Sequence, residues 1–385
     1  AVARHLFNRG IDVTVTCLEK PSGPALADYE IAENMNIDIR PYDGVKKCDL
    51  LIDAILGTGI NCDVTGLYKT VIESINASGI PVLSLDIPSG INGDTGKVCG
   101  CATRAFKTVT FGFPKLGLYS PLSIDYTGDV VTCDISIPRY APSGKISRKL
   151  LTKGTLNLPV KSRASHKGDG GKVLIIGGTG KMPGAPYMAA SAAEKCGAGL
   201  VTAAVPEEYC IPIMKRLTGA MCVPIDGTLP ERISKADSVL IGGGMGNNEN
   251  TLSLVETAVK GFLNTLIIDA DGLNVLAENK KILKNKKNII ITPHMGEMSR
   301  LTKLSIPEIT ENRVLIAEDF SREYGVTVVL KGAGTVVAAE GFSTYINSTG
   351  NAGMAKGGSG DILAGMIAGF CASKIPDAVA LAVYL

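Results

Sequence analysis

Residues 351–370, "NAGMAKGGSGDILAGMIAGF", place glycines, a serine and one acid, Asp361, directly before an apolar run whose spacing suits a buried helix. Glycines let the backbone approach a ligand closely. The first amides of a following helix point free N–H groups and the positive end of the helix dipole outward. The stretch therefore predicts an α/β fold in which the start of a buried helix cradles a phosphate or an oxyanion.

The presence of an acid in this cradle needs an explanation, because the negative charge of Asp361 cannot attract an anion. One explanation is that it accepts the proton of a hydroxyl group that attacks the cradled phosphoryl group. The other is that it caps the helix, a common role of aspartate. The surrounding glycines favour the first explanation.

Working outward, apolar β-rich runs alternate with segments of helical length, which is typical of parallel, doubly wound sheets. A polar stretch at residues 137–171 interrupts this alternation, and we place a domain junction within it, between domains 1–145 and 150–385. The runs before it are "IDVTVTCLE", "DLLIDAILG", "IPVLSLDIPSG" and "AFKTVTFGFP". The runs after it are "KVLIIGG", "LVTAAVP", "SVLIGGG", "TLIIDADG", "NIIITPH", "VTVVLKG" and "TVVAAEG", so the second sheet is predicted to be the larger.

Composition narrows the class of protein. The 385 residues carry 39 basic and 37 acidic side chains, so no long-range field favours nucleic acid or an anionic membrane. The ten cysteines form no C-x-x-C pair, no apolar run reaches membrane length, and the start lacks the features of a signal peptide. We therefore expect a cytoplasmic enzyme with a small-molecule substrate, without nucleic-acid or membrane partners. We also expect a homo-oligomer.

Polar and glycine residues follow several strands of the second domain, at the edge where α/β sheets bind ligands. Some of them also have plain structural explanations. Lys331 could be a strand-end lysine that reaches solvent, and His294 could be satisfied by backbone groups. Glu297 and Arg300, three residues apart, could pair on a helix surface.

In their order, the motifs "IIDADGLN", "TPHMGEMSRL", "LKGAGTVV" and "NAGMAKGGSGD" resemble the ADP-dependent NAD(P)H-hydrate dehydratases, which have a ribokinase-like fold. The resemblance implies that ADP, or ATP, with Mg²⁺ phosphorylates the C6 hydroxyl of the S hydrate of NAD(P)H (NADHX or NADPHX). Phosphate then leaves, and AMP is the second by-product when ADP is the donor. Hydroxide is a poor leaving group, so phosphorylation makes the elimination feasible.

By this resemblance Asp361 is the catalytic base. The nucleotide would contact Lys331, Gly332, Ala333, Gly334, Thr335 and Gly360. The hydrate would contact Ala185, Gly246, His294 and Asp361. Asn274, Glu297 and Arg300 lie in the same motifs and are further candidates.

In the first domain, "DLLIDAILGTGINCDVTG" and "SLDIPSGINGDTG" resemble the NAD(P)H-hydrate epimerases, which have a Rossmann-like three-layer fold, interconvert the R and S hydrates and precede the dehydratase in many bacterial fused proteins. The resemblance implies that the catalytic Asp53 and Ser89 help to hold K⁺, a hard cation that prefers oxygen ligands. Asp86 would bind the hydrate near the reacting carbon. The substrate phosphate would contact Gly57, Thr58, Gly59, Ile60, Asn61, Cys62 and Asp63.

The sequence also departs from that family. "AVARHLFNRG" resembles the end of the helix that follows an Asn-Asn-Gly-Gly-Asp-Gly loop, and this loop is absent. We therefore expect an N-terminal fragment with an impaired epimerase, and a chain that stops within a helix at "DAVALAVYL". Three alternatives stay open: a ribokinase-like kinase of a small alcohol, a first domain that only binds, and purely structural roles for Asp53 at a strand end and Ser89 in a turn.

Overall fold

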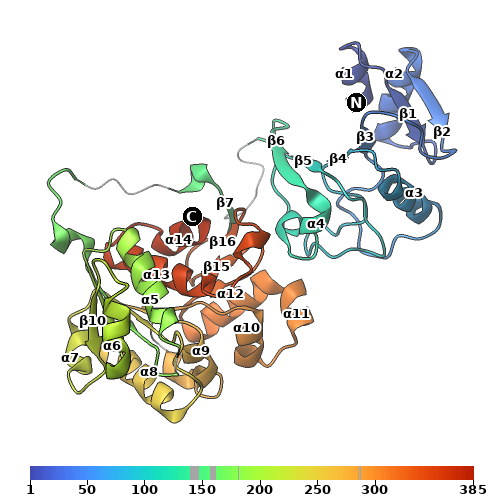
Figure 1. Ribbon diagram of the computed structural model, residues 1–385. Helices are drawn as coiled ribbons and strands as arrows, with labels where there is room; N and C mark the ends of the chain where they lie inside the picture. Colours follow the sequence, from blue (N-terminus) through green and yellow to red (C-terminus); the bar gives the residue numbers. More distant parts are fainter. Residues whose placement is uncertain (139–146, 157–161, 181, 285, 287) are drawn as a thin grey trace. The chain divides into compact units, whose positions relative to one another are not determined.

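The computed structural model describes residues 1–138, 147–156, 162–180, 182–284, 286 and 288–385, so parts of the junction predicted at residues 137–171 lie outside them. The chain forms two compact units, shown in Figure 1. The first comprises Ala1–Leu118 and Leu122–Ile137, and the second comprises Tyr119–Pro121 and Pro138–Leu385.

Every strand pair of the first unit is parallel, but the strands form two sheets. One pairs β1 (Thr14–Cys17) with β2 (Asp38–Pro41), and the other has the order β3 (Leu51–Asp53), β4 (Val82–Leu85), β5 (Lys107–Phe111), β6 (Asp129–Cys133). The prediction of one parallel sheet in the first domain is therefore wrong. None of the residues of β1 and β2 is buried, so these strands lack the two covered faces of a central strand.

The helices of this unit are α1 (Val2–Phe7), α2 (Pro24–Asn34), α3 (Gly66–Ala77) and α4 (Ile124–Thr127), and the short 3₁₀ helix η1 spans Leu116–Tyr119. The helices predicted at both ends of the chain are present, the second as α14 (Ala378–Tyr384) of the other unit.

The second unit is built on one ten-stranded sheet. Its order is β10 (Met221–Pro224), β9 (Leu200–Val205), β8 (Lys172–Ile176), β11 (Ser238–Ile241), β12 (Thr265–Ile268), β13 (Ile289–Ile291), β14 (Thr327–Leu330), β15 (Val336–Ala338), β16 (Thr344–Asn347), β7 (Arg148–Leu151). Only β15 runs antiparallel to its neighbours. The sheet is the larger one, as predicted, but β7, β10 and β16 were missed, and β7 lies inside the polar stretch assigned to the junction.

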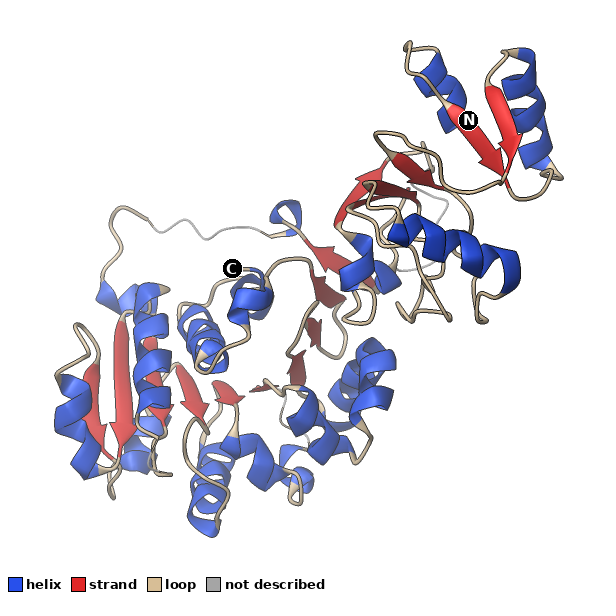
Figure 2. Ribbon diagram, turned by 45° about the vertical axis from the view of Figure 1, so that its right-hand side comes forward, coloured by secondary structure: helices blue, strands red, loops and turns tan. Residues whose placement is uncertain are grey.

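Helices cover both faces of this sheet, as Figure 2 shows. They are α5 (Gly184–Lys195), α6 (Glu207–Met214), α7 (Leu229–Ser234), α8 (Glu249–Gly261), α9 (Asp271–Leu276), α10 (Met295–Thr302), α11 (Ile306–Glu311), α12 (Arg313–Tyr324), α13 (Ser359–Ala372) and α14. Short 3₁₀ helices are η2 (Lys153–Thr155), η3 (Lys167–Gly170), η4 (Lys280–Leu283) and η5 (Ala352–Met354). Alternate residues of the central strands point to opposite faces, and Ile175, Leu240 and Ile267 pack with α5, α13 and α14 in one buried cluster.

Glycines bring α13 very close to α5. A Cβ atom on Gly365 would lie 2.2 Å from the carbonyl oxygen of Ala189, and one on Gly369 would lie 2.9 Å from that of Ala193. This close packing fixes the start of α13, with Asp361, beside the start of α5, with Ala185. Although α13 is strongly apolar, no helix in the described part of the chain is long and apolar enough to cross a membrane.

Candidate active site

Asp361 is the third residue of α13, and the residue at the cap position is Gly358, in a left-handed conformation with φ 94°. Gly358 makes no side-chain cap bond and stands where a capping residue would be, so Asp361 is not the N-cap residue of this helix. The carboxylate instead lines a pocket together with Ala185, Gly243 and Asp269. A Cβ atom on Gly243 would lie 3.2 Å from Asp361 Oδ1, so a side chain there would crowd the acid.

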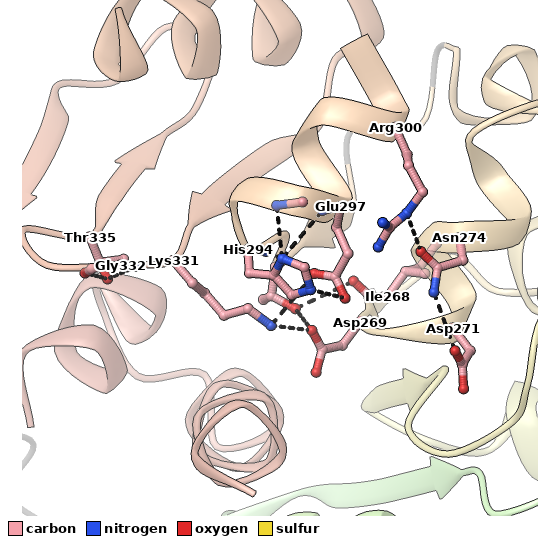
Figure 3. A network of polar contacts seen from close by, with 12 residues as sticks. Ile268, Asp269, Asp271, Asn274, His294, Glu297, Arg300, Lys331, Gly332 and Thr335 are labelled. Atoms are coloured by element: carbon pink, nitrogen blue, oxygen red, sulfur yellow. Dashed lines mark hydrogen bonds and ion pairs between the residues drawn. The ribbon is translucent and has the colours of Figure 1, made fainter. Parts of the chain in front are cut away.

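Three neighbouring strands end in polar residues that meet beside Asp361. Lys331 follows β14, and its Nζ lies 2.7 Å from Oδ1 of Asp269, which follows β12 (Figure 3). Thr292, which follows β13, donates its hydroxyl hydrogen to the same oxygen at 2.7 Å. Lys331 is thus paired, with only 16% of its side chain exposed, and the alternative that it simply extends into solvent is wrong.

The electrostatics of this cluster suit a base beside a cation. Burial raises the pKa of Asp361 to about 6, and the negative charge of Asp269 adds to this while Lys331 opposes it. Burial alone would lower the pKa of Lys331, but attraction to Asp269 and Glu297 more than offsets it, so the pKa is raised. Near neutral pH the carboxylate of Asp361 is ionised and able to accept a proton, and Lys331 stays charged.

His294 and Glu297 cap the start of α10 reciprocally. His294 Nδ1 accepts hydrogen bonds from the amides of Gly296 (2.9 Å) and Glu297 (3.3 Å), and Glu297 Oε2 accepts one from the His294 amide (2.8 Å). Burial, with the charges of Lys331 and Arg300, lowers the pKa of His294. We infer a neutral imidazole with its proton on Nε2, which lies 3.4 Å from Glu297 Oε1.

Burial also raises the pKa of Glu297 to about 7, against the attraction of Lys331, whose Nζ lies 3.9 Å away. The alternative that backbone groups hydrogen-bond His294 is therefore correct for one ring nitrogen, Nδ1. The other nitrogen faces a buried carboxylate, and about half of the side chain is exposed.

A chain of hydrogen-bonded side chains connects Gly246 to Arg300. Its amide donates to Asp271 Oδ2 at 2.7 Å, Asn274 Nδ2 donates to Asp271 Oδ1 at 3.2 Å, and Arg300 Nε donates to Asn274 Oδ1 at 2.8 Å. Arg300 therefore points to Asn274 while Glu297 points to His294 and Lys331 (Figure 3). The alternative of a Glu297–Arg300 pair on the helix surface is wrong.

The segment 331–335 forms a tight loop between β14 and β15. The Gly332 amide donates to Thr335 Oγ1 at 3.3 Å, and that hydroxyl donates to the Gly332 carbonyl at 2.9 Å. Gly334 has φ 61°, a conformation that favours glycine. A Cβ atom on Gly360 would lie 3.3 Å from Lys331 Nζ, so the two predicted nucleotide segments meet at this lysine.

In the first unit, Asp53 is buried and accepts four hydrogen bonds. Ser89 Oγ (2.5 Å) and the Ile55 amide (3.3 Å) donate to Oδ1, and Ser84 Oγ (2.8 Å) and the Ser89 amide (2.8 Å) donate to Oδ2. Both predicted potassium ligands thus lie together, and each already has protein partners. The loop of Gly57–Asp63 is mostly exposed, and Asn92 Nδ2 holds it by donating to the Ile60 carbonyl at 2.8 Å.

Asp86 has a left-handed backbone, with φ 68°, which is rare for a residue other than glycine. Its Oδ1 accepts hydrogen bonds from the ammonium group of Lys115 and from the Phe111 amide (3.0 Å). Burial by itself raises the pKa of Asp86, but these hydrogen bonds and the charge of Lys115 lower it overall. The first unit therefore presents an ion pair, Asp86 with Lys115, at the carboxyl ends of its strands.

Sequence reasoning gave no role to four polar residues of these sites: Asp269, Asp271, Thr292 and Lys115. The signal was available, because all four stand within a few residues of the end of an apolar strand run. The fold and the site place the second unit among the ribokinase-like α/β enzymes. Comparison with known proteins identifies the family within this class of enzymes.

Residues 173–385 match the family described as NAD(P)H-hydrate dehydratase, and residues 1–117 match the one described as YjeF-related protein N-terminus. The chain is 37% identical to the bifunctional NAD(P)H-hydrate repair enzyme of Moorella thermoacetica, covering 99% of this chain and 77% of that one. It is 35% identical to the Escherichia coli enzyme, covering 97% and 73%. The chain belongs to this family of repair enzymes.

Solved structures agree with the fold. A ribokinase-like superfamily protein of Enterococcus faecalis has a TM-score of 0.57 at 29% identity, covering 62% of this chain and 85% of that one. The ADP/ATP-dependent NAD(P)H-hydrate dehydratase of Bacillus subtilis, co-crystallised with ATP/Mg²⁺, has a TM-score of 0.52 at 29% identity, covering 59% and 82%.

Proposed function

We propose that the second unit dehydrates the S form of hydrated NADH or NADPH, with ADP or ATP as the phosphoryl donor. The observation that carries this proposal is the half-buried carboxylate of Asp361 at the glycine-rich start of α13, beside the Lys331–Asp269 ion pair. Together they offer a base and a positive charge at one place, as phosphoryl transfer to a hydroxyl group requires.

The steps follow from these positions. Asp361 takes the proton of the C6 hydroxyl as its oxygen attacks the terminal phosphoryl group of the nucleotide. Lys331 and the free amides at the start of α13 stabilise the negative charge on the transferring group. The phosphate ester then eliminates, which restores the reduced nicotinamide and releases phosphate; ADP leaves as AMP.

Magnesium fits this site. In the described part of the chain no cluster of three acidic, histidine or cysteine ligands forms a dedicated metal cage. Mg²⁺ commonly binds through substrate phosphates and one or two carboxylates, and Asp269 and Glu297 supply carboxylates beside the proposed nucleotide loop. When bound, the ion would neutralise phosphate charge.

For the first unit we propose epimerisation of the R and S hydrates, with Asp86 and Lys115 at the reacting carbon. The ion pair and the strained backbone of Asp86 support this, since such strain gathers at functional sites. The oxygens of Asp53 and Ser89 suit K⁺ chemically, but in this arrangement they bind protein donors, so we derive no step through the ion. The homo-oligomer and the cytoplasmic location stay predictions.

The test is a product balance. The protein is incubated with the purified S hydrate of NADH, ADP and Mg²⁺, and NADH, AMP and phosphate are quantified. We expect the three products in equal amounts. A small-alcohol kinase would instead leave the hydrate intact and phosphorylate an added alcohol without releasing phosphate, and that outcome would overturn the proposal.

A further inference from the structure

Arg313, the first residue of α12, is buried, with 5% of its surface exposed. Its Nη1 donates a hydrogen bond to the carbonyl oxygen of Ala333. Within the described residues, Nε and Nη2 have no hydrogen-bond partner. A buried guanidinium group with most of its donors unsatisfied is costly, because it has lost its water without a full replacement.

The guanidinium group lies directly against the 331–335 loop. A Cβ atom on Gly332 would be 3.9 Å from Nη2, and one on Gly334 would be 3.7 Å from Nη1. Both glycines have positive φ, 148° and 61°, and neither carries a side chain that would separate the loop from the charge. The positive charge therefore lies against the backbone of the loop that we assign to the nucleotide phosphates.

The bond to Ala333 also orients the loop. In a planar trans peptide the C=O of one residue and the N–H of the next point in opposite directions. Because Arg313 holds the Ala333 carbonyl on its own side, the Gly334 amide points away from Arg313. Gly334 is itself buried, and the exposed part of the loop is Gly332 and Ala333. Among the described residues we find no acceptor for that amide.

We propose that Arg313 is a further residue of the phosphate site: it places a positive charge against the 331–335 loop and fixes the Ala333–Gly334 peptide, so that the loop binds the terminal phosphates of a nucleoside diphosphate or triphosphate. The inference rests on the proposed function. Among the described residues no carboxylate perturbs the pKa of Arg313, so an anion on the loop would supply the missing countercharge. Burial lowers this pKa only to about 10, so the charge persists at neutral pH.

Two variants test the inference. Arg313→Met removes the charge and both kinds of donor at similar volume, and Arg313→Gln removes the charge but keeps an amide donor for Ala333. The matched control is Arg322→Met on the same helix, because Arg322 is exposed and pairs with Asp319 at 2.9 Å. Dissociation constants for ADP, AMP and inorganic pyrophosphate are measured by calorimetry, and melting temperatures are measured without ligand.

In both Arg313 variants we expect ADP and pyrophosphate to bind at least about tenfold more weakly, because the positive charge next to the phosphate loop is lost. AMP should weaken less, so the ratio of the AMP to the ADP dissociation constant should fall. The melting temperature without ligand should hold or rise, since an uncompensated buried charge is gone. Arg322→Met should change none of these.

Unchanged ADP binding, or an equal loss for AMP and ADP with a lower melting temperature, would show that Arg313 is merely structural. If Arg313→Met does not fold, Arg313→Gln decides between the same outcomes. If the wild type binds ADP and pyrophosphate with the expected dependence on Arg313 but ADP supports no dehydration, the proposed function fails and this inference stands. If the wild type binds neither, both fail.

Discussion

At the scale of single residues, the proposed dehydration depends on the protonation state of Asp361. Its pKa is raised to about 6, first by burial and then by the charge of Asp269. A base must be deprotonated to act, so the rate of dehydration should rise with pH through about 6 and level off above it. Asp269 thus has two effects, since it also fixes Lys331.

Asp269→Asn tests both effects. It removes the like charge next to Asp361, so the rise of the rate with pH should move to lower pH. It also leaves Lys331 without its closest partner, so the maximal rate should fall by at least about tenfold. A pH profile of kcat for the two proteins is the measurement, and a profile that moves to higher pH would contradict this electrostatic explanation.

Glu297 carries a prediction about stability. Its folded pKa of about 7 lies above its ordinary value of 4.5, so the folded state keeps a proton that the unfolded state loses. The free energy of unfolding should therefore fall as the pH rises from about 4.5 to 7, by at most about 3 kcal/mol from this group.

Glu297→Gln keeps an oxygen for the His294 amide but cannot ionise. It should raise the melting temperature at pH 8 and change it little at pH 5. Thermal unfolding at the two values measures this. A larger gain at pH 5 than at pH 8 would refute the assignment of this burial penalty to Glu297.

At the scale of elements, the glycines at the start of α13 leave space beside this helix for a ligand. Alanine at position 360 would improve the intrinsic helix propensity by up to about 1 kcal/mol. Its Cβ, however, would lie 3.3 Å from Lys331 Nζ, inside the space assigned to the nucleotide. Gly360→Ala should therefore keep or raise the melting temperature while activity falls by at least about tenfold.

The control for this variant is Gly261→Ala at the end of α8, where an added Cβ would meet nothing within 4 Å. It should leave activity unchanged. Full activity in Gly360→Ala would show that no ligand needs the space beside Lys331.

The elements also show what the sequence could and could not predict. Strands such as β8, β11 and β12 were predictable because the sheet covers both of their faces, which makes nearly every residue apolar. β7 (RKLL) and β16 (TYIN) were missed because polar residues interrupt these strands near one edge of the sheet. The meeting of Asp361 with Lys331 follows from the shared edge of a parallel sheet.

The role of Arg313 could not be predicted, since an arginine at a helix start looks like a solvated residue until its burial is known. The sequence also could not predict that the carboxylate of Asp53 already accepts hydrogen bonds from protein groups, because the donors Ser84 and Ser89 come from distant parts of the chain. Pattern identifies the ends of strands; only the fold shows which side chains lack or have a partner.

At the scale of the whole molecule, two units carry two separate chemistries, so variants in one should spare the other. Asp86→Asn weakens the ion pair with Lys115 without opening a buried network, and should slow epimerisation by at least about tenfold while dehydration of the S hydrate is unchanged. Chromatographic separation of the R and S forms over time measures both. Asp53→Ala is a poorer test, because it would leave four hydrogen-bond donors unsatisfied and unfold its surroundings.

The most direct test of the central claim compares Asp361→Asn with the wild type on the purified S hydrate of NADH with ADP and Mg²⁺, following the absorbance of the reduced nicotinamide and measuring ADP binding in parallel. The substitution keeps the size of the side chain and removes its ability to take a proton. We predict that ADP still binds within about threefold of the wild type while NADH recovery falls by at least about a thousandfold. Recovery at a comparable rate in Asp361→Asn would contradict the account, because the base would then lie elsewhere.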